Sequence, residues 1–397
     1  SDVCSSDLSP MWKMRRFLID GVITISLMFG LVSTAYADSA LELIKDIEVH
    51  GFSSSSYSQN FANPTGTRQN ALRVYDFDAN TFKFDVAELV LKKDAAEIGD
   101  VGFRTDLTYG FSGPQANKVG GPNVTLSDGT TADVSDDDFD LQIAYVQYNA
   151  PIGNGLLIDV GKFGTNIGSE VMDGYDGFNY TFSRSFLFFL GPFTHNGVRV
   201  QYQLSDTVGL LGILSNGHDT TTDTNDSKGF GGQISWAVSD SAVVYLNYFG
   251  SAEPQTGVPN NADELRNFFD TVIEISLSNK LLLNLNAVYG SEDDATGPNT
   301  GDHTWWGFSG IARYDVNNWF SLNYRAQIFH DQDGARSGSR QKLWAMSLTP
   351  EVRINSNMVV RAEYRHDESD HYVFSNRDGA GTASTQDTLA LNALFYF

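Results

Sequence analysis

The chain ends on alternating apolar residues, and this segment restricts the fold more than any other part of the sequence. Between positions 388 and 397, every second residue is apolar: Leu389, Leu391, Ala393, Phe395 and Phe397. An extended strand would place all of them on one face. A soluble domain rarely ends on such a strand, because its open edge invites aggregation, whereas a closed barrel pairs its last strand with its first. We therefore expect this segment to close a transmembrane barrel; a last strand in a soluble sandwich is the alternative.

Three further segments alternate in the same way. In 320–330, 281–289 and 358–364, apolar residues occupy one parity, while polar or charged residues occupy much or all of the other. Alternation with period two predicts strands and does not fit a helix. Strands of about 9 to 11 residues are long enough to cross a bilayer at a tilt.

The same pattern along the chain predicts an all-β transmembrane antiparallel β-barrel of about sixteen strands. The predicted strands are 47–60, 79–93, 100–112, 137–150, 155–163, 193–204, 207–216, 228–239, 242–250, 264–278, 281–290, 303–315, 319–331, 339–353, 358–368 and 386–397. Short connections alternate strictly with long ones that are rich in Gly, Asp, Asn and Thr. Outer-membrane barrels show this alternation, with short periplasmic turns and long outer loops, and a soluble sandwich has no reason to keep it.

The first residues have the features of an export signal. Residues 1–10 precede a Met and fit no structural role, so we interpret them as an artefact. Residues 11–37 combine a basic start, an apolar core at 21–32 and a small-x-small site that ends at Ala37. This pattern predicts a cleaved signal peptide, with residues 38–397 forming one barrel domain in the outer membrane of a Gram-negative bacterium.

Composition excludes several classes of partner and chemistry. The net charge is -23, and an acidic chain is a poor match for nucleic acid. The single cysteine, Cys4, lies before the predicted mature chain, so we expect no disulfide and no thiolate site. The histidines are scattered without metal-ligand spacing, and Gly-x-Ser-x-Gly is absent. We therefore expect no metal, no cofactor and no catalytic residues.

Three motifs occur in order across one long connection. They are Val160-Gly161-Lys162-Phe163-Gly164, then Phe182-Ser183-Arg184-Ser185-Phe186, then Pro192-Phe193-Thr194-His195-Asn196-Gly197-Val198-Arg199. With these motifs, the chain resembles the beta-barrel porins of the OmpL-like group from Gram-negative bacteria. The resemblance implies a passive outer-membrane channel and no particular solute. Phe395 and Phe397 also resemble the terminal assembly signal that the barrel-insertion machinery of such bacteria reads.

If the apolar parity faces lipid, the other parity lines a water-filled lumen. This reasoning places charged candidates for pore lining on the lumen side, with the basic ones concentrated in the late strands. They are Arg104, Asp106, Arg199, Asp270, Glu274, Arg313, Arg325, Arg361, Glu363 and Arg365, joined by Lys83, Asp85 and Glu88. A slip in phase near Ala87, between these last three, suggests a bulge.

The connection 164–192 combines acidic groups with an apolar run. It carries Glu170, Asp173, Asp176 and Arg184, followed by the run 186–190. An apolar run is unfavourable in outer solvent, so we predict that this loop enters the barrel and narrows it, with its carboxylates across from the late-strand arginines. Rings of charged side chains are one means by which pores select among ions. The alternative is that the run 186–190 extends the next strand to the lipid surface.

The sequence thus predicts a porin for passive diffusion of small hydrophilic solutes. An outer-membrane surface hydrolase, assembled around residues such as His218 and His303, and a non-conducting adhesion or structural barrel are the alternatives. Lipid, lipopolysaccharide and the barrel-assembly machinery are the expected partners, and the sequence leaves a homotrimer open. Aromatic residues near strand ends are predicted to form interfacial girdles: Trp305, Trp306, Trp319, Trp344, Tyr364 and Tyr396.

Overall fold

The structure is a computed structural model, which describes residues 46–65, 69–110, 138–221, 223, 225, 227–252, 265–293 and 301–397. The predicted artefact and the signal peptide with its cleavage site at Ala37 lie outside the described residues. Within them, no helix is long and apolar enough to span a membrane.

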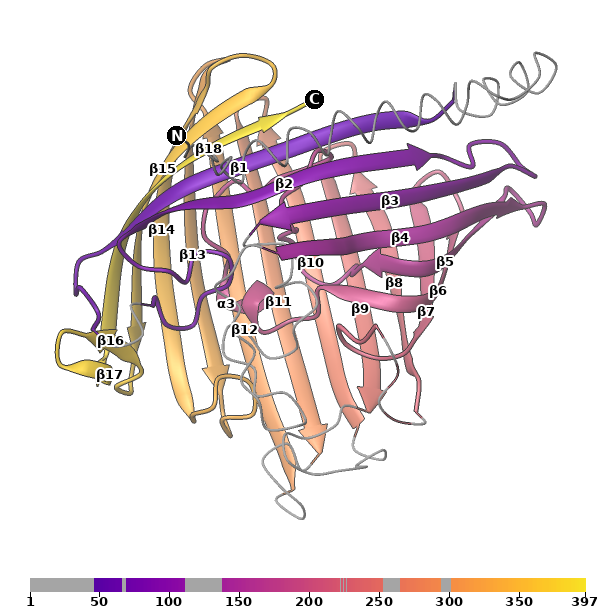
Figure 1. Cartoon of the computed structure of the whole chain (residues 1–397). Coiled ribbons are helices and arrows are strands. Elements are labelled where there is room, and N and C mark those ends of the chain that lie inside the picture. The colour runs from indigo at the N-terminus through magenta and orange to yellow at the C-terminus, as the bar shows by residue number, and fades with distance from the viewer. Residues whose placement is uncertain are drawn as a thin grey trace, which may run out of the picture. The chain divides into compact units, whose positions relative to one another are not determined.

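Sixteen strands of the described chain close into one antiparallel barrel (Figure 1). They are β1 (Glu48–Asn60), β2 (Thr81–Lys93), β3 (Val101–Gly110), β4 (Asp138–Ala150), β5 (Leu156–Gly164), β6 (Thr194–Gln203), β7 (Val208–Ser215), β8 (Gly229–Ser239), β9 (Ala242–Ala252), β10 (Leu265–Ser278), β11 (Leu281–Asp293), β12 (Asp302–Asp315), β13 (Phe320–Asp331), β14 (Gln341–Arg353), β15 (Met358–Ser369) and β18 (Thr385–Tyr396). The predicted fold class is confirmed, and each predicted strand is present.

Two elements fall within long connections and were not predicted. The hairpin of β16 (Phe374–Asn376) and β17 (Gly379–Ala383) lies between β15 and β18 and forms its own small sheet. The one-turn helix α3 (Phe186–Phe189) lies between β5 and β6.

The last strand closes the barrel against the first, as its alternation predicts. Strand β18 pairs with β1 from Phe52↔Tyr396 to Asn60↔Thr388, and its other edge pairs with β15. Both edges of β18 are therefore hydrogen-bonded. A ring without a free edge leaves its strand backbone satisfied within hydrocarbon, which offers no partners of its own.

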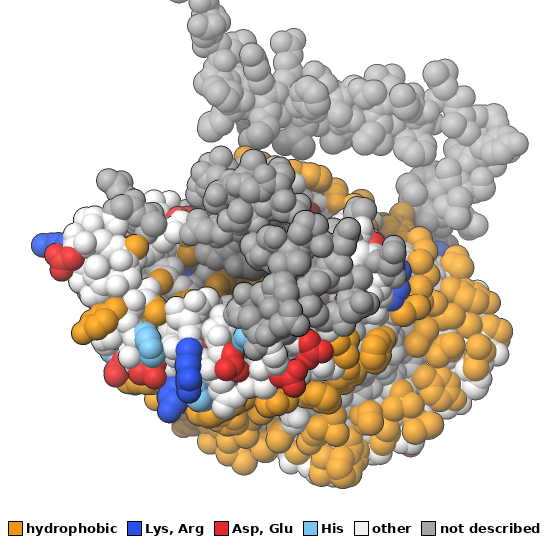
Figure 2. All heavy atoms as spheres, turned by 90° about the horizontal axis from the view of Figure 1, so that it is seen from below, with side chains coloured by type: hydrophobic (Ala, Val, Ile, Leu, Met, Phe, Trp, Pro, Cys, Tyr) orange, Lys and Arg blue, Asp and Glu red, His pale blue; other side chains and the backbone are white. Residues whose placement is uncertain are grey.

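Buried and exposed side chains alternate along the strands, as expected if one parity faces the lumen and the other faces lipid. In β13, Ser321, Asn323, Arg325 and Gln327 are buried, whereas Leu322, Tyr324 and Ile328 are 37%, 45% and 44% exposed. Figure 2 shows apolar side chains over the outside of the wall, and acidic and basic side chains gathered at the end of the barrel that faces the viewer. The exposed rows suit lipid, and the polar rows face the lumen.

The slip in phase predicted near Ala87 is present in β2. Asp85 and Val86 are adjacent in sequence and both buried, after which burial continues at Glu88 and Val90. Consecutive inward residues mark a local irregularity in a strand. The slip keeps Glu88 on the lumen side.

One predicted girdle residue was placed wrongly. Trp306, Trp319, Trp344 and Tyr364 are more than one third exposed, but Trp305 is fully buried. Its ring packs near Phe268 and lies under the guanidinium of Arg336. Two adjacent strand residues point to opposite faces, so Trp305 and Trp306 could not both face lipid.

The lipid-facing rows lead to a first prediction. Leu391 lies in the middle of β18, opposite Tyr57, and Leu277 lies beside the turn that ends β10; they are 54% and 57% exposed. We expect Leu391→Arg to lower the free energy of unfolding by about 2–4 kcal/mol and Leu277→Arg by about 0–1 kcal/mol, because the cost of a charge falls toward the bilayer surface. Urea titration of tryptophan fluorescence in lipid vesicles measures both. Equal losses at the two positions would contradict the assigned lipid face.

Candidate pore and the loop inside the barrel

Residues 165–193, here called the inner loop, join β5 to β6 and lie on the lumen side of the wall. The backbone N–H of Phe186 donates to the inward-facing side chain of Gln327 at 2.7 Å, and Leu187 contacts the wall at Gly307. The apolar run 186–190 is buried except for Phe189, so the alternative that it extends a strand to the lipid surface is wrong.

The two ends of the inner loop are held together at the barrel wall. The N–H of Thr165 donates to the carbonyl of Phe193 at 3.0 Å. A carboxylate oxygen of Asp219 accepts from the N–H groups of Phe193 and Thr194 at 2.7 and 2.8 Å. The segment between the ends therefore leaves the wall as a closed loop.

The turn α3 forms where the sequence supplies a cap. The hydroxyl of Ser185 accepts from the N–H of Phe188 at 3.1 Å, which satisfies one of the donors that a helix start leaves free. Glu170 accepts from the N–H of Ser185 at 2.9 Å. The residue Glu170 thus orders the loop as well as carrying charge.

Glu170 also forms an ion pair with the wall. A guanidinium nitrogen of Arg325 donates to Glu170 at 2.8 Å, and both side chains are at most 3% exposed. The same guanidinium donates to the hydroxyls of Thr181 and Ser183. Arg325 therefore binds both arms of the inner loop.

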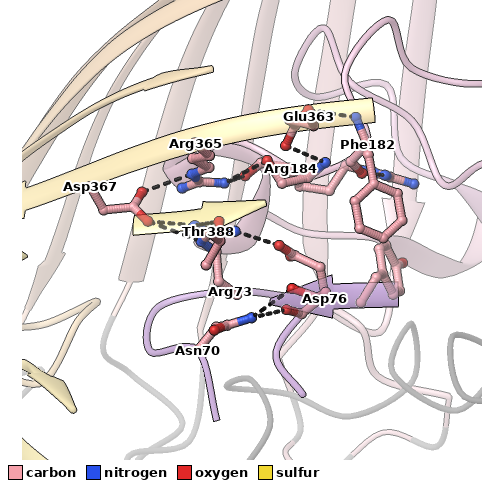
Figure 3. Close-up of polar contacts among 12 residues, drawn as sticks. Asn70, Arg73, Asp76, Phe182, Arg184, Glu363, Arg365, Asp367 and Thr388 are labelled. Carbon is pink, nitrogen blue, oxygen red and sulfur yellow. Dashed lines mark hydrogen bonds and ion pairs between the residues drawn. The ribbon is translucent and has the colours of Figure 1, made fainter. Parts of the chain in front are cut away.

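Strand β15 supplies three more contacts from a single inward row (Figure 3). Glu363 accepts from the N–H groups of Phe182 and Ser183 at 2.7 and 3.0 Å. Arg365 donates to the carbonyl of Arg184 and pairs with Asp367 at 2.7 Å. Alternate residues of one strand can all reach the loop because they share a face.

Asp173 connects the tip of the inner loop to the same wall. Its carboxylate pairs with Arg184 at 3.1 Å and with Arg361 at 3.4 Å. Burial lowers the pKa of the Arg184 guanidinium, but Asp173, Tyr75, Glu170 and Asp76 together outweigh burial, so the pKa lies above its ordinary value. Asp173 thus links Arg184 of the loop to Arg361 of the wall.

The sequence predicts that the loop carboxylates lie across the lumen from the late-strand arginines. For Glu170 and Asp173 this prediction is wrong. These carboxylates contact Arg325 and Arg361 directly. The physical reason is that buried charges are stable only when paired, so the loop packs onto the arginines and neutralises them. They do not face each other across water.

A second loop supports the inner loop, and sequence reasoning missed it. In the β1–β2 connection, Arg73 forms ion pairs with Asp76 and Asp367 and donates to Thr388 (Figure 3). Burial lowers the pKa of Arg73, but the carboxylates of Asp367, Asp76 and Glu363 together outweigh burial, so the pKa is raised. Asp367 continues the inward parity of β15, which is the signal that could have identified it.

Aromatic packing joins the two loops. The ring of Tyr75, from the β1–β2 connection, lies 6.1 Å from that of Phe188 and 6.5 Å from that of Phe193. The guanidinium of Arg184 lies 5.1 Å from the same tyrosine ring. Desolvation is the largest cause of the raised pKa of Tyr75, so its phenol stays neutral. The β1–β2 connection thus packs against the inner loop through Tyr75.

A cavity of about 300 Å³ lies on the other side of the inner loop. It is bounded by the loop itself and by the inward rows of β2 to β6. Its charged lining residues are Glu88, Arg104, Asp106, Glu170, Asp176 and Arg199.

The charged groups of this cavity are held in fixed positions. Arg104 donates to Asp106 at 2.8 Å and to Asp176 of the inner loop at 2.7 Å. Arg199 pairs with Asp159 at 2.8 Å. Glu88 accepts from the N–H of Tyr175 at 2.9 Å. The wall therefore binds the tip of the inner loop, and the polar cavity lies beside these contacts.

The remaining predicted pore residues lie elsewhere in the lumen. Asp270 is buried and accepts from Asn247 and from the N–H of Gly168. Arg313 pairs with Glu351 at 3.0 Å, and Glu274 is exposed near the end of β10. Neither of these last two lines the cavity.

The predicted terminal assembly signal is exposed in the folded barrel. Phe395 and Phe397 are 47% and 59% exposed, and Phe397 exchanges backbone hydrogen bonds with Gly51. Recognition of this signal by the assembly machinery stays a prediction.

Other chemistry finds little support in the described residues. They contain no group of three or more potential metal ligands. His218 is buried beside the Phe249 ring, and burial lowers the pKa of its imidazole well below the ordinary value. The imidazole of His303 is buried as well.

The charge pairing behind the inner loop gives a second prediction. Removing one partner leaves a buried charge without compensation, so Arg325→Met should lower the free energy of unfolding by about 3–5 kcal/mol. The matched change Lys228→Met breaks an exposed pair with Asp223 and should cost about 0–1 kcal/mol. Both are measured by urea titration in lipid vesicles.

A double variant separates pairing from simple loss of contacts. If Glu170 is compensated by Arg325, then Glu170→Met combined with Arg325→Met should be less destabilised than Arg325→Met alone. Additive losses in the double variant would argue against the ion pair as the source of the stability.

Comparison with known proteins gives a family and a fold. The family model described as "Putative beta-barrel porin-2, OmpL-like" matches residues 46–397. No curated protein matches the chain in sequence.

Solved structures share the barrel at low sequence identity. The outer membrane channel DcaP of Acinetobacter baumannii is 12% identical, with a TM-score of 0.57 over 88% of this chain and 97% of that chain. An anion-selective porin from Comamonas acidovorans is 10% identical, with a TM-score of 0.56 over 88% and 99%. The trimer form of OmpT, an outer membrane protein of Vibrio cholerae, is 11% identical, with a TM-score of 0.57 over 88% and 99%. At these identities the likeness concerns the fold alone.

Proposed function

Because the chain belongs to the OmpL-like family of putative beta-barrel porins, we propose that it forms a water-filled channel for passive diffusion of small hydrophilic solutes across the outer membrane. The observation that carries this proposal is the polar cavity of about 300 Å³ between the inner loop and the β2–β6 wall. A barrel of sixteen strands is wide enough for an aqueous lumen. Diffusion down a gradient needs no cofactor and no catalytic group.

The conducting path in this proposal is off-centre. On the β13–β15 side, Arg325, Glu363 and Arg365 bind the inner loop directly, so solute has no room there. On the β2–β6 side, the loop and the wall are separated by the cavity. The inner loop then narrows the pore by filling one side of the lumen.

In this proposal, the partners expected from the sequence contact the outer surface of the barrel. Lipid covers the apolar rows, and the outer loops contact lipopolysaccharide. A homotrimer is included as well, since OmpT of Vibrio cholerae, which shares the barrel fold, is known in a trimer form. A cleaved signal peptide delivers the chain to the periplasm, where the assembly machinery reads Phe395 and Phe397.

Planar-bilayer recording of the purified protein tests the main proposal. Ohmic steps support a channel. Silence together with ester or peptide turnover would support the hydrolase, and silence alone would support a structural barrel. Liposome swelling with sugars of increasing size then tests whether small hydrophilic solutes pass.

The position of the path gives a third prediction. Because the only cysteine is Cys4, single cysteines can be introduced into the mature chain. Val171→Cys places a thiol on the cavity, where Val171 is 48% exposed, so a charged thiol reagent should lower the conductance stepwise. The control Ser347→Cys lies beside Arg325 and is 1% exposed, so the reagent should leave its conductance unchanged.

Two outcomes would contradict the off-centre path. Modification of Val171→Cys without a change in conductance would exclude the cavity as the path. Block at Ser347→Cys would show that solute passes along the arginine side of the loop.

A further inference from the structure

The charges around the cavity do not cancel. Glu88, Asp106 and Asp176 approach it from β2, β3 and the inner loop, and the single cation among them is Arg104. Three carboxylates and one guanidinium give this cluster, here called the acidic cluster, a formal charge of about -2 when all are ionised.

Arg104 is fully engaged within the acidic cluster. Its guanidinium donates to both oxygens of Asp106 and to one oxygen of Asp176. The ring of Tyr175 lies 5.4 Å from the same guanidinium. The positive charge is therefore held close to two negative ones and is mostly screened from an ion that passes beside them.

Glu88 takes part in no salt bridge among the described residues. Its carboxylate accepts from the N–H of Tyr175 and lies against Gly174. Among the residues that the structure describes, no Lys, Arg or His pairs with Glu88. Lys92, four residues further along β2, pairs with Asp94 at 3.2 Å. Glu88 is only 7% exposed, but it lines the cavity and carries its charge there without a salt bridge to a described residue.

Charges on the neighbouring elements do not compensate the acidic cluster. Arg199, the other cation of the lining, pairs with Asp159, and Glu170 pairs with Arg325. Each of these pairs is neutral. The cavity therefore has an excess of negative charge, which comes from Glu88 and from Asp176 with Asp106.

We propose that the channel prefers cations, and that Glu88, Asp106 and Asp176 set this preference. The favoured solutes are small monovalent cations and small organic ammonium ions. This inference rests on the proposed channel function and adds its charge selectivity. A unit charge about 6 Å from an ion in water changes the local concentration of that ion about threefold at low salt. Screening reduces the effect as the salt concentration rises.

Reversal potentials in a KCl gradient test the proposal in planar bilayers at about pH 8, where carboxylates are ionised. We expect the native channel to pass K⁺ more readily than Cl⁻, with a larger ratio in dilute salt. The double variant Glu88→Gln with Asp176→Asn should lower the permeability ratio about threefold or more. Removing the cation in Arg104→Gln should raise it.

The matched control removes two carboxylates that lie outside the cavity. Asp206 and Asp240 are exposed residues in short turns after β6 and β8. Asp206→Asn with Asp240→Asn should leave the permeability ratio unchanged. An equal change in this control would assign the selectivity to the overall charge of the protein instead of the acidic cluster.

The outcomes separate this inference from the proposed function. Ohmic conductance without a preference for K⁺, or with a preference for Cl⁻, overturns the inference and leaves the channel intact. Conductance that prefers K⁺ but is unaffected in the cavity variants overturns the assignment to these residues. Absence of conductance in the native protein defeats the channel itself, and the inference with it.

Discussion

The structure depends on the need of every strand to satisfy its backbone within the barrel. Hydrocarbon provides no hydrogen-bond partners, so a strand that crosses it must be paired on both edges. Pairing of β18 with both β1 and β15 meets this need for the last strand of the ring. Once the ring is closed, alternate side chains must face lipid and lumen, because a strand has no third direction. The polarity of the lumen follows from this closure.

A closed lumen creates a second requirement, which the inner loop fulfils. The inward rows of β13 and β15 carry Arg325, Arg361 and Arg365, which are fully buried. Buried guanidinium groups need carboxylates and carbonyls around them. The inner loop brings Glu170 and Asp173 together with backbone carbonyls to these arginines. The wall thus determines on which side the loop lies, and the opposite side is left open.

Much of the barrel could be predicted from the sequence, because period-two alternation depends only on the strand itself. The bounds of β10 and β12 differ from the predicted 264–278 and 303–315 by one residue. The path of the loops could not be predicted in this way. Whether Glu170 faces Arg325 across water or touches it depends on contacts between segments far apart in the sequence. The pairing of Arg73 with Asp367 has the same origin, although the parity of Asp367 was readable.

The sign of the charge in the pore is a separate matter from the fold. Closure and alternation require only that inward positions be polar, and Lys, Arg, Asp and Glu meet that requirement equally well. The sign is decided where the inner loop approaches β2 and β3. There Arg104 is shared between Asp106 and Asp176, so one cation is used to hold the loop tip in place. Because Asp176 is the second carboxylate that pairs with the Arg104 guanidinium, it strengthens the contact between the loop and the wall and leaves the pair of carboxylates with one uncompensated negative charge. The same contact that fixes the width of the cavity therefore contributes to its charge.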